Sequence, residues 1–263
     1  MQSGLYVVGT PIGNLRDFSV RAVETLKNVD LILCEDSRQA KKLLAHFNIR
    51  SKLFVFAEYN EKESLQNLIE KIERSAVAII TDSGMPGISD PGFRLVRACR
   101  ENNLSVFIVP GPTAFTSALI LSGFPIDKFT FLGFFKGEKE LIEDNHLRHT
   151  IIYYESPNRV MNTIKLIAKI MPERKLAIVR EITKIHEETI IGYPSDLLNI
   201  DPPRGEVVLV IAPAPDRKIT DSEISTIVSD IISKTEKTKD AAIKIAKKAG
   251  ISKKEAYNRV LKS

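Results

Sequence analysis

The stretch VAIITDSGMPGISDPG (77–92) joins a run of four apolar residues to a long loop that contains glycine and proline. Comparable apolar runs stand at LYVVG (5–9), DLILC (30–34) and SVFIV (105–109). They contain Val, Ile and Leu without strict alternation, which is typical of strands that are covered on both faces. Between these runs lie segments with a helical pattern, at residues 19–29, 64–74 and 93–102. This alternation predicts an α/β fold whose first half contains a mostly parallel sheet.

A second series of apolar runs follows. Its members are FTFLGFF (129–135), TIIYYES (150–156), KLAIVREI (175–182), EETIIGY (187–193) and GEVVLVIA (205–212). Only a short polar connection separates KLAIVREI from EETIIGY, so we expect these two runs to pair as a hairpin within a mixed sheet that has fewer helices. We place the boundary between the two α/β halves near PGPTAFTSAL (110–119), which gives domains over 1–112 and 113–214. A cleft between two such domains is a natural ligand site.

The end of the chain carries all of its basic excess. From Arg217 to Ser263 there are 12 Lys and Arg against six Asp and Glu, whereas residues 1–216 hold 26 against 27. The proline-rich APAPDR (212–217) introduces this segment, and we therefore treat 215–263 as a separate basic appendage. Its charge is typical of a protein that binds a polyanion, and the alternative is a solvated, lysine-rich helical face.

Within the appendage, residues 237–261 show the pattern of two helices joined at a glycine, in the manner of a helix-turn-helix unit. Ser252 stands where the N-cap of the second helix is expected, with Glu255 at the capping-box position. The apolar positions that we expect in its core are Ile243, Ala246, Ile251, Ala256 and Val260.

Composition narrows the class of protein. The 263 residues are 43% hydrophobic and 27% charged, which is enough apolar material for a sizeable core in two domains. No apolar run approaches the roughly 20 residues of a membrane span. The opening MQSGLYVVGTPIGN lacks the features of a signal peptide, and Cys34 and Cys99 alone cannot form a disulfide framework. We expect a soluble, cytoplasmic protein.

Four polar loops follow the predicted strands of the first half, where α/β proteins bind their ligands. They are GTPIGN (9–14), CEDSR (34–38), TDSGMPGISDPG (81–92) and VPGPT (109–113). The glycines, prolines and polar residues of any one such loop can be explained as an ordinary turn. Four such loops at successive strand ends instead indicate a site where the backbone comes close to a ligand. The sequence contains no G-x-G, no phosphate-binding G-x-x-x-x-G-K-[ST] and no histidine spacing that suits zinc.

The second half contributes three polar clusters, YYESPNR (153–159), REITKIHEE (180–188) and PRGE (203–206). They are expected to crowd one side of the cleft, with salt-bridged structural charge as the alternative. We expect His186 to face solvent or a hairpin turn. Cys34 is expected to be a packed residue, because neighbouring Glu35 and Asp36 oppose a thiolate. These residues indicate an enzyme with a cleft but do not define its reaction.

Taken together, seven segments resemble the ribosomal RNA small-subunit methyltransferase I family, a branch of the tetrapyrrole (corrin/porphyrin) methylase superfamily. In chain order they are GTPIGNLRD, CEDSRQAKKLL, ITDSGMPGISDPG, VPGPTA, YYESPNR, REITKIHEE and PRGEVVLV. The resemblance runs from Gly4 to Ile211. It implies methylation of a cytidine ribose 2′-oxygen in the decoding region of 16S rRNA, with S-adenosylmethionine as methyl donor and no metal. It further implies two α/β domains with the cofactor between them, a homodimer, and the assembled 30S subunit as partner.

The same resemblance assigns a set of cofactor-binding residues. They are Pro11, Ile12, Ser83, Gly84, Met85, Ile88, Thr113, Ala114, Tyr154 and Gly192. Met85 stands where tetrapyrrole enzymes commonly have an acidic residue, so backbone contacts are the firmer expectation there.

A ribose hydroxyl is a poor acid, so a carboxylate or a neutral lysine is expected to accept its proton. The candidates are Asp36, Glu155 and Lys184. For RNA phosphates the candidates are Arg38, Arg159 and, in the appendage, Lys247, Lys248, Lys253 and Lys254. Two alternatives stay open, namely methylation of a small molecule such as a tetrapyrrole and a non-catalytic rRNA-binding assembly factor.

Overall fold

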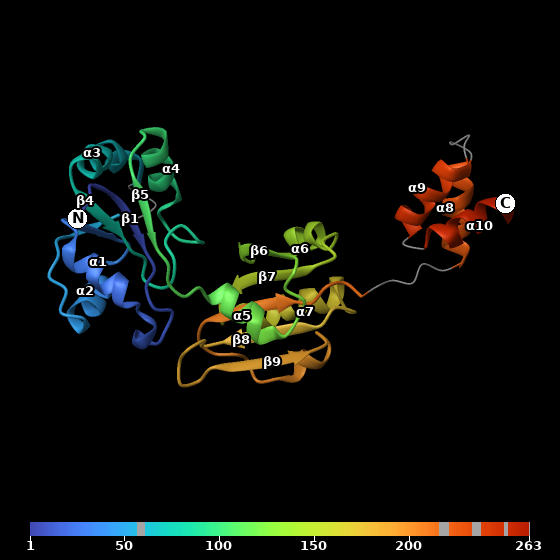
Figure 1. Cartoon of the computed structure of the whole chain (residues 1–263). Coiled ribbons are helices and arrows are strands. Elements are labelled where there is room, and N and C mark those ends of the chain that lie inside the picture. The colour runs from blue at the N-terminus through green and yellow to red at the C-terminus, as the bar shows by residue number, and fades with distance from the viewer. Residues whose placement is uncertain (57–60, 216–220, 233–237, 250–251, 263) are drawn as a thin grey trace. The chain divides into compact units, whose positions relative to one another are not determined.

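The computed structural model describes residues 1–56, 61–215, 221–232, 238–249 and 252–262 (Figure 1). The chain forms two compact units, Met1–Ala214 and Pro215–Ser263. Within the described residues, no helix is both long and apolar enough to cross a membrane.

The first unit begins with a five-stranded sheet in which all strands run parallel. In the order β3-β2-β4-β1-β5, it contains β1 (Gly4–Val8), β2 (Leu31–Cys34), β3 (Leu53–Val55), β4 (Ala76–Ile79) and β5 (Val106–Val109). The predicted parallel sheet is therefore confirmed. Strand β3 was not predicted, because it has three residues and lies at the edge of the sheet.

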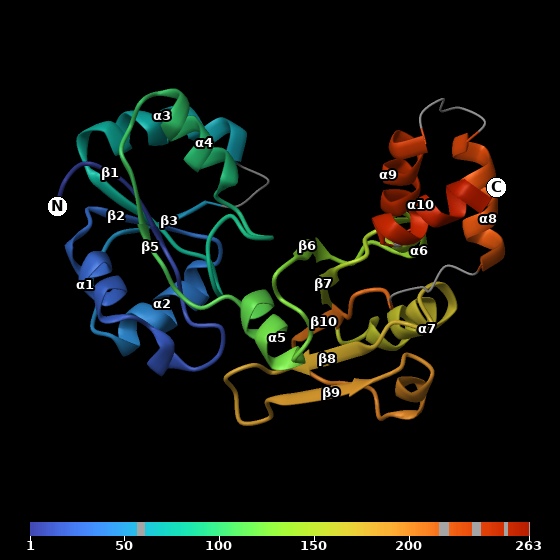
Figure 2. The ribbon, with the colours of Figure 1, turned by 45° about the vertical axis from the view of Figure 1, so that its right-hand side comes forward.

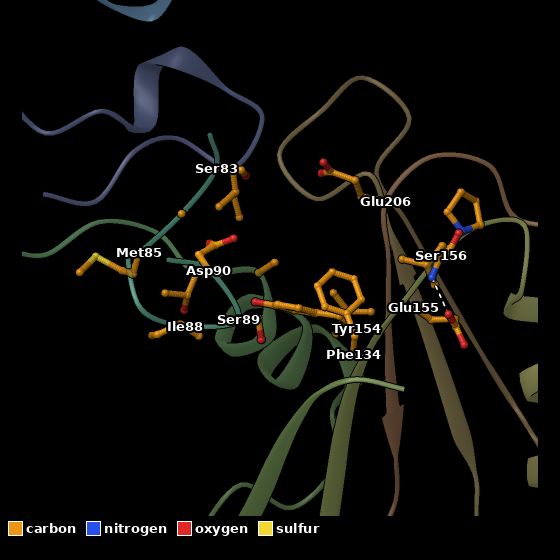
Figure 3. A pocket seen from close by; sticks show the side chains of 17 residues that line it. Ser83, Met85, Ile88, Ser89, Asp90, Phe134, Tyr154, Glu155, Ser156 and Glu206 are labelled. Atoms are coloured by element: carbon orange, nitrogen blue, oxygen red, sulfur yellow. Dashed lines mark hydrogen bonds between the residues drawn. The ribbon is translucent and has the colours of Figure 1, made fainter. Parts of the chain in front are cut away.

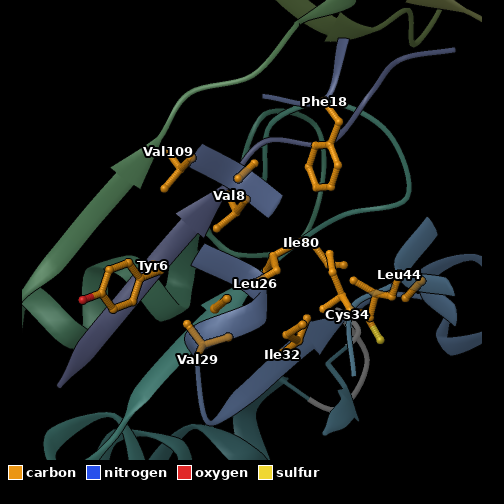
Figure 4. Close-up of a cluster of buried hydrophobic side chains, with 14 of the residues drawn as sticks. Tyr6, Val8, Phe18, Leu26, Val29, Ile32, Cys34, Leu44, Ile80 and Val109 are labelled. Atoms are coloured by element: carbon orange, nitrogen blue, oxygen red, sulfur yellow. The ribbon is translucent and has the colours of Figure 1, made fainter. Parts of the chain in front are cut away.

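Helices cover both faces of this sheet (Figure 2). They are α1 (Val20–Asn28) and α2 (Ser37–His46) on one face, and α3 (Glu61–Arg74) and α4 (Phe93–Glu101) on the other. Successive residues of a strand point to opposite faces. Tyr6 and Val8 of β1 accordingly pack with α1 and α2 (Figure 4), whereas Leu5 and Val7 pack with α3 and α4. Burial on both faces explains why these strands lack alternation.

A second five-stranded sheet follows, in the order β6-β7-β10-β8-β9. Its strands are β6 (Phe129–Phe134), β7 (Thr150–Glu155), β8 (Leu176–Arg180), β9 (Glu188–Gly192) and β10 (Val207–Ile211). Strand β6 runs parallel to β7, while the other neighbours are antiparallel, and β8 pairs with β9. The predicted mixed sheet and its hairpin are confirmed.

Three helices pack on the second sheet. On one face lies α5 (Ala114–Ser122), and on the other lie α6 (Glu138–Asp144) and α7 (Val160–Ile170). Ile12, from the loop after β1, is buried in the same cluster as α5 and therefore ties the first sheet's loop to the second sheet. Two short 3-10 turns, Leu15–Asp17 (η1) and Asp196–Asn199 (η3), complete this unit.

The second unit contains α8 (Asp221–Ile232), α9 (Thr238–Ala249) and α10 (Lys253–Lys262). Its core consists of Ile224, Val228, Ile231, Ala241, Ala242, Ile245 and Ala256. The Ser252 hydroxyl accepts the backbone N–H of Glu255 at 3.1 Å, which confirms the predicted N-cap. The prediction of Ile243 as a core residue is wrong, because the buried side of α9 passes through Ala241, Ala242 and Ile245 instead. The predicted core residue Ile251 lies outside the described residues.

Candidate active site

A cavity of about 320 Å³ in the first unit is lined by residues from both sheets. From the first half these are Ile12, Ser83, Gly84, Met85, Ile88, Ser89, Asp90, Thr113 and Ala114. From the second half they are Phe134, Tyr154, Glu155, Ser156, Pro157, Glu206, Val207 and Val208. Most of the first group follow β1, β4 or β5, so the cavity lies where an α/β sheet binds its ligands.

The loop after β4 supplies more of the lining than any other segment, and its backbone is held in conformations that favour glycine. Gly84 and Gly87 have φ of +82° and +83°. Thr10 fixes the loop from the neighbouring strand end, because its N–H donates to the Gly84 carbonyl at 2.9 Å and its hydroxyl donates to the Thr81 carbonyl at 3.1 Å. The glycines thus allow the chain to turn sharply at the cavity wall.

The loops after β1 and β5 approach each other at Gly9 and Gly111, more closely than a side chain at either position would allow. A Cβ on Gly9 would lie 2.6 Å from the backbone nitrogen of Gly111 and 2.5 Å from the Met85 sulfur. The Gly111 N–H donates to that sulfur at 3.2 Å. Met85 is therefore fixed by packing and hydrogen bonding, and both glycines are needed for the close approach.

Asp90 is the carboxylate of the β4 loop that lines the cavity. Burial, together with the negative charges of Glu35 and Asp82, raises its pKa to about 7. These acidic residues come from the loops after two adjacent strands, β2 and β4. A carboxylate with a pKa near neutrality is suited to accept a proton during a reaction.

Tyr154 forms the opposite wall and projects toward Ser89 and Asp90 (Figure 3). Its ring packs edge-on against Phe131 and Phe134, with centroid distances of 4.8 and 5.4 Å. Burial raises the pKa of its hydroxyl to about 12, so it stays protonated at neutral pH.

The charges that line the cavity have one sign. Asp90, Glu155 and Glu206 are acidic, and no Lys, Arg or His is found among the described residues of the lining. Apolar side chains, including Ile12, Met85 and Phe134, provide much of the remaining surface. Such a cavity favours a ligand that combines apolar surface with positive charge.

Eight of the ten residues expected at the cofactor line this cavity, and two do not. Pro11 is buried next to Ile12. Gly192 pairs with Leu176, at the end of the hairpin remote from Arg180, and packs against Leu197. We therefore do not keep Pro11 and Gly192 in the cofactor set.

Glu155 was expected to act as a base, but its carboxylate is turned away from Tyr154 and fully occupied (Figure 3). Its side chain is 0% exposed, and it accepts hydrogen bonds from the Ser156 N–H at 2.6 Å and the Thr163 hydroxyl at 2.5 Å. Arg159 adds an ion pair at 2.9 Å. These contacts hold the start of α7 and favour a structural role for Glu155.

Lys184 was also expected as a base, yet its ammonium group lies 2.9 Å from Glu206 and 3.0 Å from Glu181. Burial alone would lower its pKa, but the hydrogen bonds to Glu206 and Glu181 outweigh burial and raise it. Lys184 therefore stays protonated at neutral pH, which is the wrong state for a base.

Asp36, the third expected base, does not line the cavity. It caps the N-terminus of α2, and hydrogen bonds from Arg38 lower its pKa to about 2. Such a weak base is a poor proton acceptor. The adjacent Cys34 is buried, and burial together with Asp82 and Asp36 raises its pKa to about 11, which confirms that it is a packed residue.

The expected RNA-binding residues lie at the surface. Arg38 is bonded to Asp36, and the half-exposed Arg159 is bonded to Glu155. Lys253 and Lys254 are exposed on α10. The side chains of Lys247 and Lys248 lie outside the described residues.

Sequence reasoning missed several lining residues, above all Asp90 and Glu206. Both stand within quoted motifs, TDSGMPGISDPG and PRGE. A usable signal for Asp90 was that Glu35, Asp36 and Asp82 follow neighbouring strands, so that their negative charges accumulate at one sheet edge. The depth of burial, which contributes most to its raised pKa, could not be read from the sequence.

Comparison with known proteins gives one family. Residues 4–197 match the family described as Tetrapyrrole (Corrin/Porphyrin) Methylases. A "Ribosomal RNA small subunit methyltransferase I" from Thermotoga maritima is 41% identical over 216 residues, which are 79% of this chain and 97% of that protein. The protein of the same name from Halalkalibacterium halodurans is 36% identical over 97% of this chain and 93% of its own length.

Two solved structures share the fold. A diphthine synthase has a TM-score of 0.65 at 15% identity, covering 80% of this chain and 90% of that chain. A uroporphyrin-III-C-methyltransferase from Thermus thermophilus has a TM-score of 0.56 at 19% identity, covering 80% and 94%. At 15% and 19% identity, the similarity to these structures establishes only that the two-sheet architecture is shared.

Proposed function

This chain belongs to the ribosomal RNA small subunit methyltransferase I family of the tetrapyrrole methylases, and on that premise we propose that it methylates a cytidine ribose in the decoding region of small-subunit rRNA. The methyl donor in the proposal is S-adenosylmethionine. The observation that carries the proposal is the acidic lining of the cavity, in which Asp90 has no ion pair among the described residues, whereas Glu206 is paired with Lys184 and Glu155 with Arg159. S-adenosylmethionine carries a sulfonium and an ammonium group, and negative surroundings favour both.

The lining also fits the rest of that molecule. Ile12, Met85 and Ile88 offer apolar surface to an adenine ring, and the hydroxyls of Ser83 and Thr113 can hydrogen-bond to polar groups. The proposed cofactor set is Ile12, Ser83, Gly84, Met85, Ile88, Thr113, Ala114 and Tyr154. When bound, S-adenosylmethionine supplies an electrophilic methyl group.

The protein's part in the reaction is to position the ribose and to receive its proton. We assign the second role to Asp90, because it lines the cavity and its pKa of about 7 makes it an effective acceptor at neutral pH. Phe134 and Tyr154, whose rings pack edge-on at 5.4 Å, form the wall that faces Asp90. Correct alignment of the ribose oxygen accounts for much of the rate increase in this type of catalysis.

The partners and context in the proposal come from the family. The substrate is the small-subunit rRNA within the assembled 30S particle, and the enzyme acts in the cytoplasm as a homodimer. From the pattern of apolar runs we further propose that the first unit divides into domains 1–112 and 113–214. Light scattering at micromolar concentration tests the dimer. A mass near the 29.4 kDa of one chain would contradict it.

Transfer of tritium from labelled S-adenosylmethionine tests the proposed function. The acceptors are assembled small subunits, naked rRNA and a tetrapyrrole, each offered separately to the full chain. We expect label in rRNA of the assembled subunits. Label in the tetrapyrrole alone would identify a small-molecule methyltransferase, and rRNA binding without any label would identify an assembly factor.

A further inference from the structure

A second hollow, of about 620 Å³, lies beside the active-site cavity and has no role in the chemistry described above. Three segments form it, namely the loop after β1, the end of α2 and the loop between β8 and β9. Its lining consists of Gly13, Asn14, Leu15, Arg16, His46, Thr183, Lys184, Ile185 and His186. We refer to these nine residues as the basic hollow.

Its charge is opposite to that of the cavity. Arg16, Lys184 and two histidines line it, and no carboxylate is present in the described lining. Lys184 is already balanced by Glu181 and Glu206. Arg16 is exposed, and no ion pair joins it to any carboxylate of the described residues. Arg16 therefore presents a positive charge at the hollow that an anion can neutralise.

The walls of the hollow are fixed in place before any ligand binds. The Asn14 N–H donates to the Thr183 hydroxyl at 2.9 Å, and the Thr183 N–H donates to Glu187 at 2.6 Å. Thr183 has φ of +67°, a conformation that costs a non-glycine residue about 1 kcal/mol or more. A Cβ on Gly13 would lie 2.7 Å from both Thr183 and Lys184. Strain of this kind persists where the surrounding contacts hold it, and it is common at binding sites.

Two connections place the hollow next to the active-site cavity. Ile12 lines the cavity and its neighbour Gly13 lines the hollow. Glu206 of the cavity receives a hydrogen bond from Lys184 of the hollow. A polymer whose reacting nucleotide meets the cofactor held in the cavity would thus have its adjoining backbone within reach of the hollow.

We infer that the basic hollow binds backbone phosphates of the rRNA that adjoin the methylated nucleotide. This inference rests on the proposed function, from which it takes the polyanionic substrate. Arg16 supplies the principal phosphate contact, since a guanidinium can donate two hydrogen bonds to one phosphate. Ile185, which is 97% exposed at the rim, offers an apolar contact to a ribose or base.

The test compares Arg16→Ala with Arg74→Ala. Arg74 is a matched control, because it is also exposed but ends α3, on the face of the first sheet opposite α2. Methyl transfer and binding of naked rRNA are measured at several salt concentrations. For Arg16→Ala we expect the KM for rRNA to rise about tenfold, which is the loss of one charged hydrogen-bond contact. The negative slope of log affinity against log salt concentration should become shallower by about 1.

The controls separate this inference from the function on which it rests. S-adenosylmethionine affinity and Tm should be unchanged in both variants, and His186→Ala provides a second, independent change in the hollow. If the unaltered enzyme labels no rRNA, the proposed function itself fails. If it labels rRNA but Arg16→Ala and His186→Ala behave as Arg74→Ala does, the inference is overturned. A loss confined to assembled subunits, with naked rRNA bound normally, would assign the hollow to a ribosomal protein and also overturn it.

Discussion

Asp90 is the residue on which the proposed chemistry depends, and its environment sets its pH dependence. The proton-accepting form is the carboxylate, and burial places its pKa at about 7. We therefore expect kcat to rise with pH through about 7 and to level off above it. Asp90→Asn should lower kcat by about 10²- to 10⁴-fold while S-adenosylmethionine affinity stays within a few-fold. Steady-state kinetics from pH 5.5 to 9, with both substrates saturating, measure this.

Asp82→Asn is the matched variant for the pH profile. The negative charge of Asp82 is among the causes that raise the pKa of Asp90, so its removal should move the midpoint of the profile to lower pH. Turnover on the plateau should persist. Full activity of Asp90→Asn at every pH would show that another group receives the proton.

Glu155 gives the opposite prediction, because it is buried and bonded on all sides. Glu155→Ala leaves Thr163 and Arg159 without their partner, which should cost about 1–3 kcal/mol of unfolding free energy. Below the lowered Tm, kcat should remain within a few-fold of the unaltered enzyme. Denaturant titration together with kinetics tests both parts, and a kcat as low as that of Asp90→Asn would restore Glu155 as the base.

At the scale of elements, the approach of the loops after β1 and β5 determines whether the cavity forms. In Gly9→Ala the new methyl group would meet the Gly111 backbone and the Met85 sulfur at 2.5–2.7 Å. We expect a loss of stability of about 1–3 kcal/mol from overpacking and at least tenfold weaker S-adenosylmethionine binding.

Gly123→Ala provides the control for that prediction. Gly123 has φ of +65° at the end of α5, and its Cβ would meet nothing within 4 Å. The variant should lose about 1–2 kcal/mol from backbone strain alone and bind the cofactor normally. Calorimetric titration separates the two variants, and equal cofactor affinities would contradict the role given to the Gly9–Gly111 approach.

At the scale of elements, the sequence predicts the strands of the first sheet better than it predicts the contacts between elements. Strands β1, β2 and β4 were predictable because burial on both faces leaves an unbroken apolar run. Strand β5 was predictable from its apolar run as well, although it lies at the sheet edge and its Ile108 is exposed. The partners of Glu155 could not be predicted, because Thr163 lies on a helix whose contact with the end of β7 exists only in the folded chain. The expectation for Gly192 rested on the family resemblance alone, and the structure pairs Gly192 with Leu176, at the end of the hairpin remote from Arg180.

At the scale of the whole molecule, the second unit holds the basic excess and its own core. All lining residues of the cavity belong to Met1–Ala214. About a fifth of this chain, moreover, has no counterpart in the match to the Thermotoga maritima relative. We therefore predict that truncation after Ala214 leaves S-adenosylmethionine binding nearly unchanged and weakens rRNA binding.

The loss on truncation should be mostly electrostatic. Lysines that contact phosphate displace condensed counterions, so the truncated form should show a shallower dependence of rRNA affinity on salt. Affinity measured at several salt concentrations for both forms tests this. Equal affinities and slopes, accompanied by a lower Tm, would identify the second unit as a stabilising cap.

In the proposed reaction, the acidic cavity holds the methyl donor and a ribose oxygen of rRNA receives the methyl group. The most direct test is mass spectrometry of the nucleosides released from small-subunit rRNA after reaction with the full chain and labelled S-adenosylmethionine. We expect the label to appear as 2′-O-methylcytidine and to be strongly reduced with Asp90→Asn. Label on a cytosine base, or on no nucleoside of the rRNA, would contradict it.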